Sequence, residues 1–260
     1  MSQWLTLFQK ELLEMWRNFK WIWVPITFIL LGVQEPLSSH FMPQIINSLG
    51  GLPDGAVIKI PPPSAQEVLI KGLSQYTSIG VLIIVLTTMG LLSGERKSGV
   101  AAMILVKPVS YESYVTSKWV GAMLLMWGSF LIGYLATWYY TGILFKWVPI
   151  SDFFASYFYY GLWLTLALTV TISLSAMFLT SGMAGFLSLA IVILMNVVTS
   201  SLSNWMEWSP AQITTYANKL LLTGKIPDSL FPSSLLALVC TIIFLLVGIF
   251  VFKRKELASS

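Results

Sequence analysis

The chain has 260 residues, of which 56% are apolar and only 10% are charged, and its mean hydropathy is +0.78. A soluble domain has roughly a quarter of its residues charged, because its surface must be hydrated. These values exclude a water-soluble globular protein. The formal charge of +4 comes from basic residues that flank apolar blocks and do not cluster on one polar stretch. Such a distribution argues against nucleic-acid binding and is instead a signal of membrane topology.

Residues 1–20 predict an amphipathic helix that lies in the plane of the membrane interface. Bulky apolar side chains opposite a charged face suit the boundary between headgroups and acyl chains. A helix packed on a soluble partner is the alternative. The apolar residues recur at steps of three or four and the polar ones occupy the other side: Trp4, Phe8, Leu12, Met15, Trp16 and Phe19 against Gln3, Thr6, Lys10, Glu14 and Arg17.

Six apolar blocks follow and predict six membrane-spanning helices. The last five each contain about 19 or more residues without a charge, which is enough to cross ~30 Å of hydrocarbon. The first is the weakest, because its apolar run ends at Val33, before Gln34, Glu35 and Pro36. The expected fold class is an all-α membrane protein with spans near residues 21–37, 73–92, 119–140, 153–179, 184–202 and 233–252.

The basic residues between the blocks predict the orientation. Ten fall on one side of the membrane and five on the other, and the richer side is cytoplasmic by the positive-inside rule. Both termini belong to this richer side, which requires an even number of spans. The two sets are Lys10, Arg17, Lys20, Arg96, Lys97, Lys107, Lys118, Lys253, Arg254 and Lys255, against Lys59, Lys71, Lys146, Lys219 and Lys225.

The outer loops are too small to fold into a domain of their own. The first, residues 38–71, contains Gly and Pro turns, including the triplet 61–63. The second, residues 203–232, has room for a short helix after Ser209-Pro210. The chain is therefore expected to form one transmembrane domain over residues 1–260.

The sequence lacks the residues that usually carry out catalysis or couple transport to an ion. The expected span interiors contain no Asp, Glu, Lys, Arg or His, although ion-coupled transporters usually place an ionisable group there. The sequence has one histidine, His40, one cysteine, Cys240, no HExxH motif and no GxxxxGK[ST] phosphate loop. We therefore expect no enzyme activity, metal or cofactor in this chain. Hydroxyl groups in the fourth block are predicted to hydrogen-bond between helices: Thr165, Thr169, Thr171, Ser173 and Ser175.

The most distinctive segment, residues 93–118, follows the second span. Residues 95–105 can form a short helix, and Pro108 then turns the chain. Ser110 is placed to cap a further helix, with Glu112 in its first turn. A charged, amphipathic segment between two spans suits docking on a cytoplasmic partner, and an ordinary basic loop is the alternative.

These motifs together resemble the permease of ABC-2-type transporters. Glu-x-x-x-Gly after the second span is followed by Leu-x-x-Pro-x-Ser, a Tyr and a Lys before the third. Lys10-Glu11-Leu12 with Arg17 is similar to the N-terminal interfacial helix of that family, and the end of the chain, residues 252–257, resembles its basic, acidic and Leu closing pattern. Val100 departs from the family, which often has a hydroxyl residue after this glycine.

The resemblance implies a type V exporter-like permease fold in a bacterial cytoplasmic membrane. It implies a dimer of six-span subunits, homomeric or heteromeric, with two copies of a separate ABC ATPase that binds ATP and Mg. It further implies that the second and fifth spans line the pathway, that Glu95 is an electrostatic latch, and that segment 94–110 docks on the ATPase. The coupling residues are then Glu95, Arg96, Lys97, Gly99, Pro108 and Lys118, and those of the interfacial helix are Trp4, Phe8, Lys10, Glu11 and Arg17.

Three functions remain after this comparison. The leading one is ATP-driven export of an amphipathic or apolar molecule, because uncharged, aromatic-rich spans provide no charge to balance a bare ion. A polar cargo requires a water-filled cavity within a dimer. The alternative class is a membrane assembly or anchoring subunit that transports nothing, in contact only with lipid and protein partners. A membrane-embedded enzyme is third and lacks catalytic groups.

Overall fold

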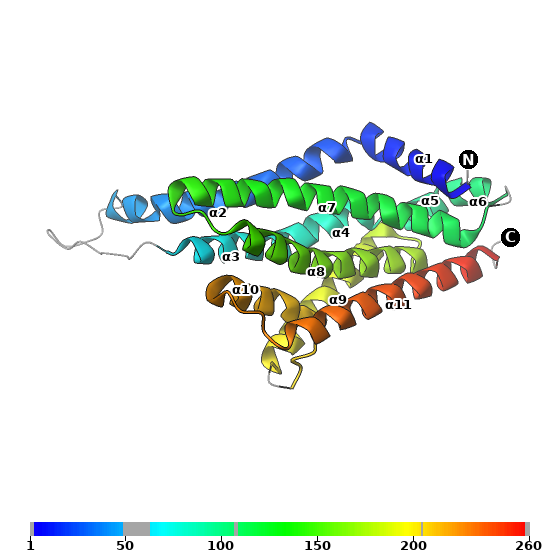
Figure 1. The fold of residues 1–260 in the computed structure, drawn as a ribbon. Helices are drawn as coiled ribbons and strands as arrows, with labels where there is room; N and C mark the ends of the chain where they lie inside the picture. Colours follow the sequence, from blue (N-terminus) through cyan, green and yellow to red (C-terminus); the bar gives the residue numbers. More distant parts are fainter. Residues whose placement is uncertain (1–2, 49–62, 107–108, 204, 258–260) are drawn as a thin grey trace.

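The protein is a bundle of helices (Figure 1). The computed structural model describes residues 3–48, 63–106, 109–203 and 205–257, and every regular element in these ranges is helical. The helices are α1 Gln3–Arg17, α2 Lys20–Ser48, α3 Ala65–Gln75, a π-helix Tyr76–Gly80, α4 Val81–Thr88, α5 Ser93–Lys97, α6 Val100–Leu105, α7 Tyr111–Leu144, α8 Ile150–Met177, α9 Ser181–Ser201, a 3₁₀-helix Pro210–Gln212, α10 Ile213–Thr223 and α11 Leu230–Leu257.

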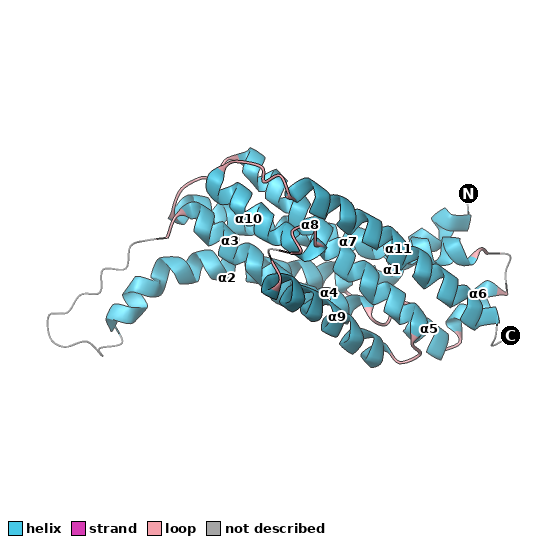
Figure 2. Cartoon of the chain, turned by 90° about the horizontal axis from the view of Figure 1, so that it is seen from below, coloured by secondary structure: helices cyan, strands magenta, loops and turns pink. Residues whose placement is uncertain are grey.

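Six of the helical runs are long and apolar enough to cross a membrane, which confirms the predicted number. Both chain ends lie at the same end of the bundle, beside α1, α5 and α6, whereas α10 and the start of α3 lie toward the other end (Figures 1 and 2). The even number of crossings agrees with this placement. The six runs are Lys20–Gln44, Ala65–Lys97, Tyr111–Leu144, Ile150–Met177, Ser181–Ser201 and Leu230–Lys255.

The first span differs from its sequence-based prediction. Helix α2 does not stop at Gln34–Pro36 but continues to Ser48, with Pro25, Pro36 and Pro43 inside it. Proline is tolerated in membrane helices because neighbouring helices and side-chain hydroxyls satisfy the freed backbone groups. The weakest of the six predicted spans is therefore a full-length helix, which extends beyond the predicted end near residue 37.

The second span is longer than the predicted block 73–92 and contains a π-helical segment. It begins at Ser64, whose side chain accepts from Glu67 N while Glu67 accepts from Ser64 N at 2.8 Å, a capping box. The π-helix Tyr76–Gly80 then separates α3 from α4. Such single-turn π segments bend and widen a helix, and they are frequent at functional sites.

Helix α8 is the centre of the bundle, and all of its residues from Tyr160 to Ala176 are buried. Four of its five predicted hydroxyl groups bond to other helices. Thr165 and Thr169 accept from Trp127 Nε1 (3.1 Å) and Trp119 Nε1 (2.9 Å) on α7, and Ser173 donates to the Phe244 carbonyl of α11 (2.7 Å). Ser175 contacts the second span and is described with the site below, whereas Thr171 donates to Ala167 O within α8.

Helices α2, α7 and the second span cross closely at two glycines. A Cβ atom on Gly133 of α7 would lie 2.6 Å from the Phe28 carbonyl oxygen of α2, and one on Gly32 would lie 2.3 Å from Gly133 O. Tyr76 completes this crossing, because its hydroxyl donates to Phe28 O at 3.1 Å and lies 3.2 Å from Thr137 Oγ1. Small residues thus allow the backbones to touch, as is common between membrane helices.

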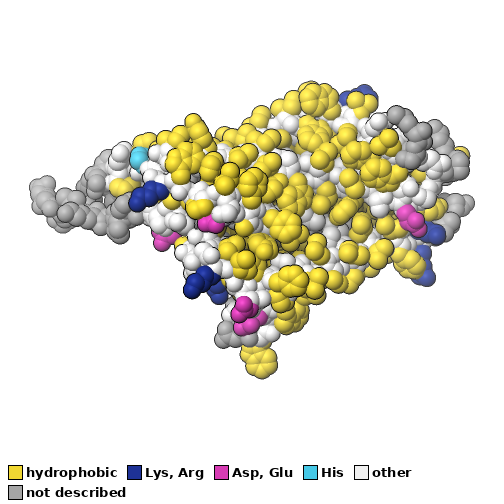
Figure 3. Space-filling view, viewed as in Figure 1, with side chains coloured by type: hydrophobic (Ala, Val, Ile, Leu, Met, Phe, Trp, Pro, Cys, Tyr) yellow, Lys and Arg dark blue, Asp and Glu magenta, His cyan; other side chains and the backbone are white. Residues whose placement is uncertain are grey.

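Apolar side chains cover the middle of the molecular surface. On the face in Figure 3, acidic and basic side chains gather toward the two ends and hydrophobic ones fill the region between them. Large apolar residues inside the spans, such as Leu86, Ile193 and Leu246, are exposed. In water such a surface would drive aggregation, whereas in a bilayer it is the surface that lipid covers.

Candidate functional site: the charge cluster and the α5–α6 segment

A cluster of charged groups joins three helices at the end of the bundle that contains both termini. Helix α1 packs on the first half of α7, which starts where Ser110 accepts from Ser113 N at 3.1 Å. This packing brings Glu11 of α1 against Lys118 of α7, and the end of the second span adds Glu95. We call Lys10, Glu11, Glu14, Glu95, Tyr114 and Lys118 the charge cluster.

Two ammonium groups connect the carboxylates of the charge cluster. Lys118 Nζ lies 2.7 Å from Glu11 Oε1 and 2.9 Å from Glu95 Oε2. Lys10 Nζ lies 2.6 Å from Glu95 Oε1, 3.1 Å from Glu11 Oε1 and 2.9 Å from Glu14 Oε2. Each oxygen of Glu95 therefore faces a different lysine, and Tyr114 donates its hydroxyl to the Oε2 atom.

Burial makes these contacts stronger than ordinary surface ion pairs. Glu11 and Lys118 are almost completely buried, at 2% and 1% exposure, whereas Lys10 is half-buried. Burial disfavours the charged form of Lys10, but its hydrogen bond to Glu95 and the charge of Glu11 outweigh this effect and raise its pKa. Lys10 therefore stays protonated at physiological pH, and α1 remains electrostatically attached to the second span.

The carboxylates of Glu11, Glu14 and Glu95 lie close enough together for a metal ion, within 4.8 Å of one another. The ammonium groups of Lys10 and Lys118 already contact all three carboxylates. Hard divalent cations need carboxylate oxygens that are not neutralised by fixed positive charges. The cluster is therefore suited to hold helices together and not to bind a cation.

The segment that follows Glu95 is not the single short helix expected from the sequence. It forms α5 and α6, which are separated at Gly99, where φ is +76°. Glycine adopts this left-handed conformation without the steric cost that a Cβ would impose. The chain therefore turns between the two helices, and we call residues 93–106 the α5–α6 segment.

Helix α5 is attached to the end of the central helix α8. The backbone N–H groups of Leu92 and Ser93 donate to Ser175 Oγ at 3.2 and 3.0 Å, and Ser175 donates to Met89 O at 2.7 Å. Arg96 donates to the Ala176 carbonyl at 3.0 Å, and its guanidinium lies 6.0 Å from the Phe252 ring of α11.

The opposite side of the α5–α6 segment is open. Lys97 and Ser98 are exposed, and so are Met103 (66%) and Val106 (87%) of α6. Helix α6, which ends near these apolar side chains, lies at the end of the bundle beside both termini (Figure 2). Exposed apolar groups, methionine among them, are typical of a surface that contacts another protein.

The structure separates the predicted coupling residues into two groups. Glu95 and Lys118 are in the charge cluster with Lys10 and Glu11 of the predicted interfacial helix, so Lys118 cannot form part of a docking surface while it is buried. Arg96 attaches α5 to α8, and Gly99 forms the turn between α5 and α6. Among the predicted coupling residues that the structure describes, only Lys97 is exposed. Pro108 lies outside the described residues. Tyr114 lies in the predicted coupling segment and Ser175 was predicted to bond between helices, but neither was among the predicted coupling residues.

The remaining interfacial-helix residues also take defined positions. The Trp4 and Phe8 rings stack with centroids 5.3 Å apart, and Trp4 Nε1 donates to Thr116 Oγ1 of α7 at 3.1 Å. Arg17 is exposed and lines a cavity of about 690 Å³ between α1 and α5, together with Lys10, Glu14 and Glu95. Four of the six residues of the predicted apolar stripe are therefore buried or partly buried, whereas Trp16 and Phe19 are exposed.

A second cavity lies between the second and fifth spans. Its volume is about 550 Å³, and it is bounded by the π-helix and the start of α4 on one side and by α9 on the other. Thr77, Ser78 and Asn196 contribute the polar groups, and the other lining residues are aliphatic: Ile79, Val81, Leu82, Leu189, Val192, Ile193 and Val197.

Six apolar helices with charged groups toward their ends define a multi-pass membrane protein. The particular family follows from comparison with known proteins. The chain belongs to the family described as "Protein of unknown function (DUF2705)", whose model matches residues 58–258. It is also similar to the "Uncharacterized transmembrane protein YxlG" of Bacillus subtilis (strain 168), with 32% identity over 252 residues, 97% of this chain and 98% of the relative.

Proposed function

We propose that the protein is the membrane-spanning subunit of an ATP-driven exporter whose ATPase is a separate chain. The observation that supports this most directly is the α5–α6 segment, which is open on one side and firmly attached on the other. Exposed Met103 and Val106 are available to a partner, while Arg96 and Glu95 connect the segment to the spans. A displacement of this segment therefore acts on α1, α7 and α8 together.

The energy source is assigned to the partner because this chain has no phosphate-binding loop in its sequence. In the proposed complex, two ATPase copies bind ATP and Mg and dock on segment 94–110 of two permease subunits, which are identical or related. The location is a bacterial cytoplasmic membrane with both termini cytoplasmic. Ten of the fifteen basic residues lie on the proposed inner side, and this excess supports the orientation.

The proposed pathway lies between the second and fifth spans. The cavity between the π-helix and α9 supports it, since its aliphatic walls with a few hydroxyl and amide groups suit an amphipathic or apolar cargo. A π-helical segment also allows the second span to change its bend at low cost. The cavity supplies no charged side chain, which disfavours a bare ion.

The second candidate is an assembly or anchoring subunit that transports nothing. It is favoured by exposed Leu13, Trp16 and Phe19 on α1, which suit attachment to the membrane interface. In that case Met103 and Val106 would contact a protein without an ATPase fold. The experiment on the α5–α6 segment described below distinguishes the two candidates.

The orientation is tested by cysteine labelling from outside intact cells on a Cys240→Ser background. A membrane-impermeant maleimide is expected to label Lys225→Cys and Lys146→Cys, because both belong to the proposed outer side. It is expected to leave Lys97→Cys unlabelled until the membrane is permeabilised. Labelling of Lys97→Cys in sealed cells would show that the assigned orientation is inverted.

The docking role is tested with a photo-crosslinking amino acid at Met103. We expect a crosslink to a soluble polypeptide that hydrolyses ATP, because Met103 is exposed at the proposed cytoplasmic end. Lys97→Glu is expected to impair transport more than ATP hydrolysis, since it alters the docking surface and leaves the Arg96 bond to Ala176 in place. The measurement is transport and hydrolysis by the purified complex in lipid nanodiscs.

The matched control places the same crosslinker at Ile243, which is also exposed but lies inside the α11 membrane span. It is expected to yield adducts with lipid. Crosslinks from Met103 to lipid alone would contradict docking at the α5–α6 segment. Crosslinks from Met103 to a protein without ATPase activity would favour the anchoring function instead.

A further inference from the structure

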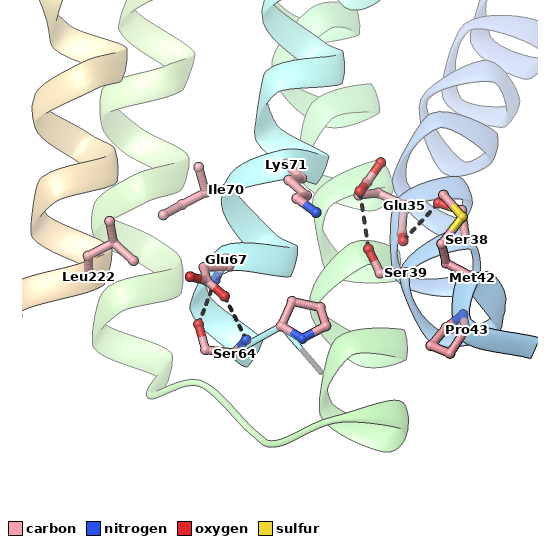
Figure 4. Close-up of a pocket in the computed structure, with 11 residues that line it drawn as sticks. Glu35, Ser38, Ser39, Met42, Pro43, Ser64, Glu67, Ile70, Lys71 and Leu222 are labelled. Atoms are coloured by element: carbon pink, nitrogen blue, oxygen red, sulfur yellow. Dashed lines mark hydrogen bonds between the residues drawn. The ribbon is translucent and has the colours of Figure 1, made fainter. Parts of the chain in front are cut away.

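A cavity of about 820 Å³ lies between α2 and α3, at the end of the bundle away from the termini (Figure 4). It is separate from the charge cluster and from the cavity beside α9. Cavities of roughly 300–1,000 Å³ commonly hold small ligands in proteins. The cavity is therefore large enough to hold a small ligand.

One part of the cavity wall is apolar and another is charged. Met42 and Pro43 of α2, Ile70 of α3 and Leu222 of α10 provide the apolar part. Glu35 and Lys71 extend from facing helices into the space between α2 and α3 (Figure 4). The lining therefore combines hydrophobic contact with one positive group, Lys71, and two negative groups, Glu35 and Glu67.

Glu35 is held in place by a hydrogen bond, whereas Lys71 is exposed, and the two groups are not paired with each other. Ser39 Oγ donates to Glu35 Oε1 at 3.2 Å, which orients that carboxylate. No ion pair within 4.0 Å joins Lys71 to a carboxylate in the described parts of the chain. The other lining carboxylate, Glu67, is engaged in the capping box with Ser64. A ligand can thus bring a charge to Lys71 and another to Glu35.

The depth of the cavity in the membrane follows from the second span. Residues 72–94 have no charged side chain, and at 1.5 Å per residue they extend about 35 Å, close to the thickness of the hydrocarbon layer. Lys71 precedes this stretch directly and therefore lies at the level of the lipid headgroups. Glu35 faces it from α2 (Figure 4). A lipid can reach both side chains from within the bilayer.

We propose that this cavity binds a phospholipid with a zwitterionic amino-phosphate headgroup, of the phosphatidylethanolamine type. The ammonium group contacts Glu35, the phosphate contacts Lys71, and an acyl chain lies along Ile70 and Leu222. The charges are complementary, because each charge of the headgroup meets an opposite one. Phosphatidylglycerol provides a phosphate but no cation for Glu35. Lipid binding at this cavity is independent of the proposed transport function.

The test uses the purified, delipidated full-length protein in detergent and native mass spectrometry. Phosphatidylethanolamine or phosphatidylglycerol is titrated, and the fraction of protein with one bound lipid is measured. We expect phosphatidylethanolamine to bind about tenfold more tightly, since one charge-assisted contact differs between the two lipids. Glu35→Gln and Lys71→Gln should each weaken its binding by about the same factor, whereas Lys71→Arg should preserve it.

Lys146→Gln is the matched control, because it also removes a lysine from this end of the molecule but lies outside the cavity. Its affinity for phosphatidylethanolamine should equal that of the unmodified protein, and unfolding temperatures in detergent verify that all variants are folded. Equal binding of the two lipids overturns the proposal, as does unchanged binding by folded Glu35→Gln. Soluble phosphoethanolamine that binds as tightly as the lipid also overturns it, because the apolar wall would then contribute nothing.

Discussion

Replacement of Lys118 by methionine is expected to destabilise the folded bundle by about 3–5 kcal/mol, the usual cost of removing one partner of a buried ion pair. Lys118 contacts both Glu11 and Glu95 and is 1% exposed. Without Lys118, the carboxylates of Glu11 and Glu95 remain in a largely dry environment, and Lys10 is the remaining ammonium group of the charge cluster that contacts them. The measurement is the free energy of unfolding in mixed micelles, by denaturant titration.

Two further variants show whether the effect comes from charge. Lys97→Met removes an exposed lysine of the same end and is expected to change stability by no more than about 0.5 kcal/mol. Adding Glu11→Gln to Lys118→Met should restore part of the loss, because it removes one of the uncompensated charges. Equal stability of the Lys118→Met and Lys97→Met proteins would mean that the charge cluster does not stabilise the fold.

Gly133→Ala is expected to have the second large effect, a loss of about 1–3 kcal/mol from overpacking. The added Cβ would lie 2.6 Å from the carbonyl oxygen and 2.8 Å from the carbonyl carbon of Phe28. Both are backbone atoms, so no side-chain rotation can relieve the clash. Helices α2 and α7 must separate, which also lengthens the Tyr76 hydrogen bonds to Phe28 and Thr137. The unfolding temperature in detergent reports the change.

Gly128→Ala on the same helix is the control, because a Cβ there meets no atom within 4 Å. Alanine has the higher helix propensity, by about 1 kcal/mol in helix interiors. The two substitutions are therefore expected to act in opposite directions although the chemical change is identical. A Gly133→Ala protein as stable as Gly128→Ala would show that the α2–α7 crossing tolerates more space than the structure indicates.

The hydrophobic pattern was sufficient to predict the number of spans, because in lipid the backbone must satisfy its own hydrogen bonds and long apolar runs become helices. The same pattern predicted the ends of several helices wrongly. Pro36 marked a stop in the sequence, yet α2 passes through it. Gly99 marked no break, yet its positive φ divides the expected helix into α5 and α6.

The candidate site was predictable only in part. Glu95 and Lys118 were identified individually, but their meeting with Glu11 depends on packing between segments 107 residues apart in the chain. One signal was present in the sequence. Glu11 lies within the apolar stripe, three residues after Phe8 and four before Met15, and a charge at such a position requires a buried partner. The spacing alone could not identify Lys118 as that partner.

The long sequence separation between Glu11 and Lys118 has a consequence for biosynthesis. At about 5–20 residues per second, roughly 5–20 s elapse between synthesis of these two residues. During this interval Glu11 has nearby lysines such as Lys10 and Lys20 as countercharges, but not its buried partner Lys118. Helix α1 therefore cannot assume its final position until α7 has been inserted. The charge cluster makes the third membrane insertion the step at which the N-terminal helix joins the bundle.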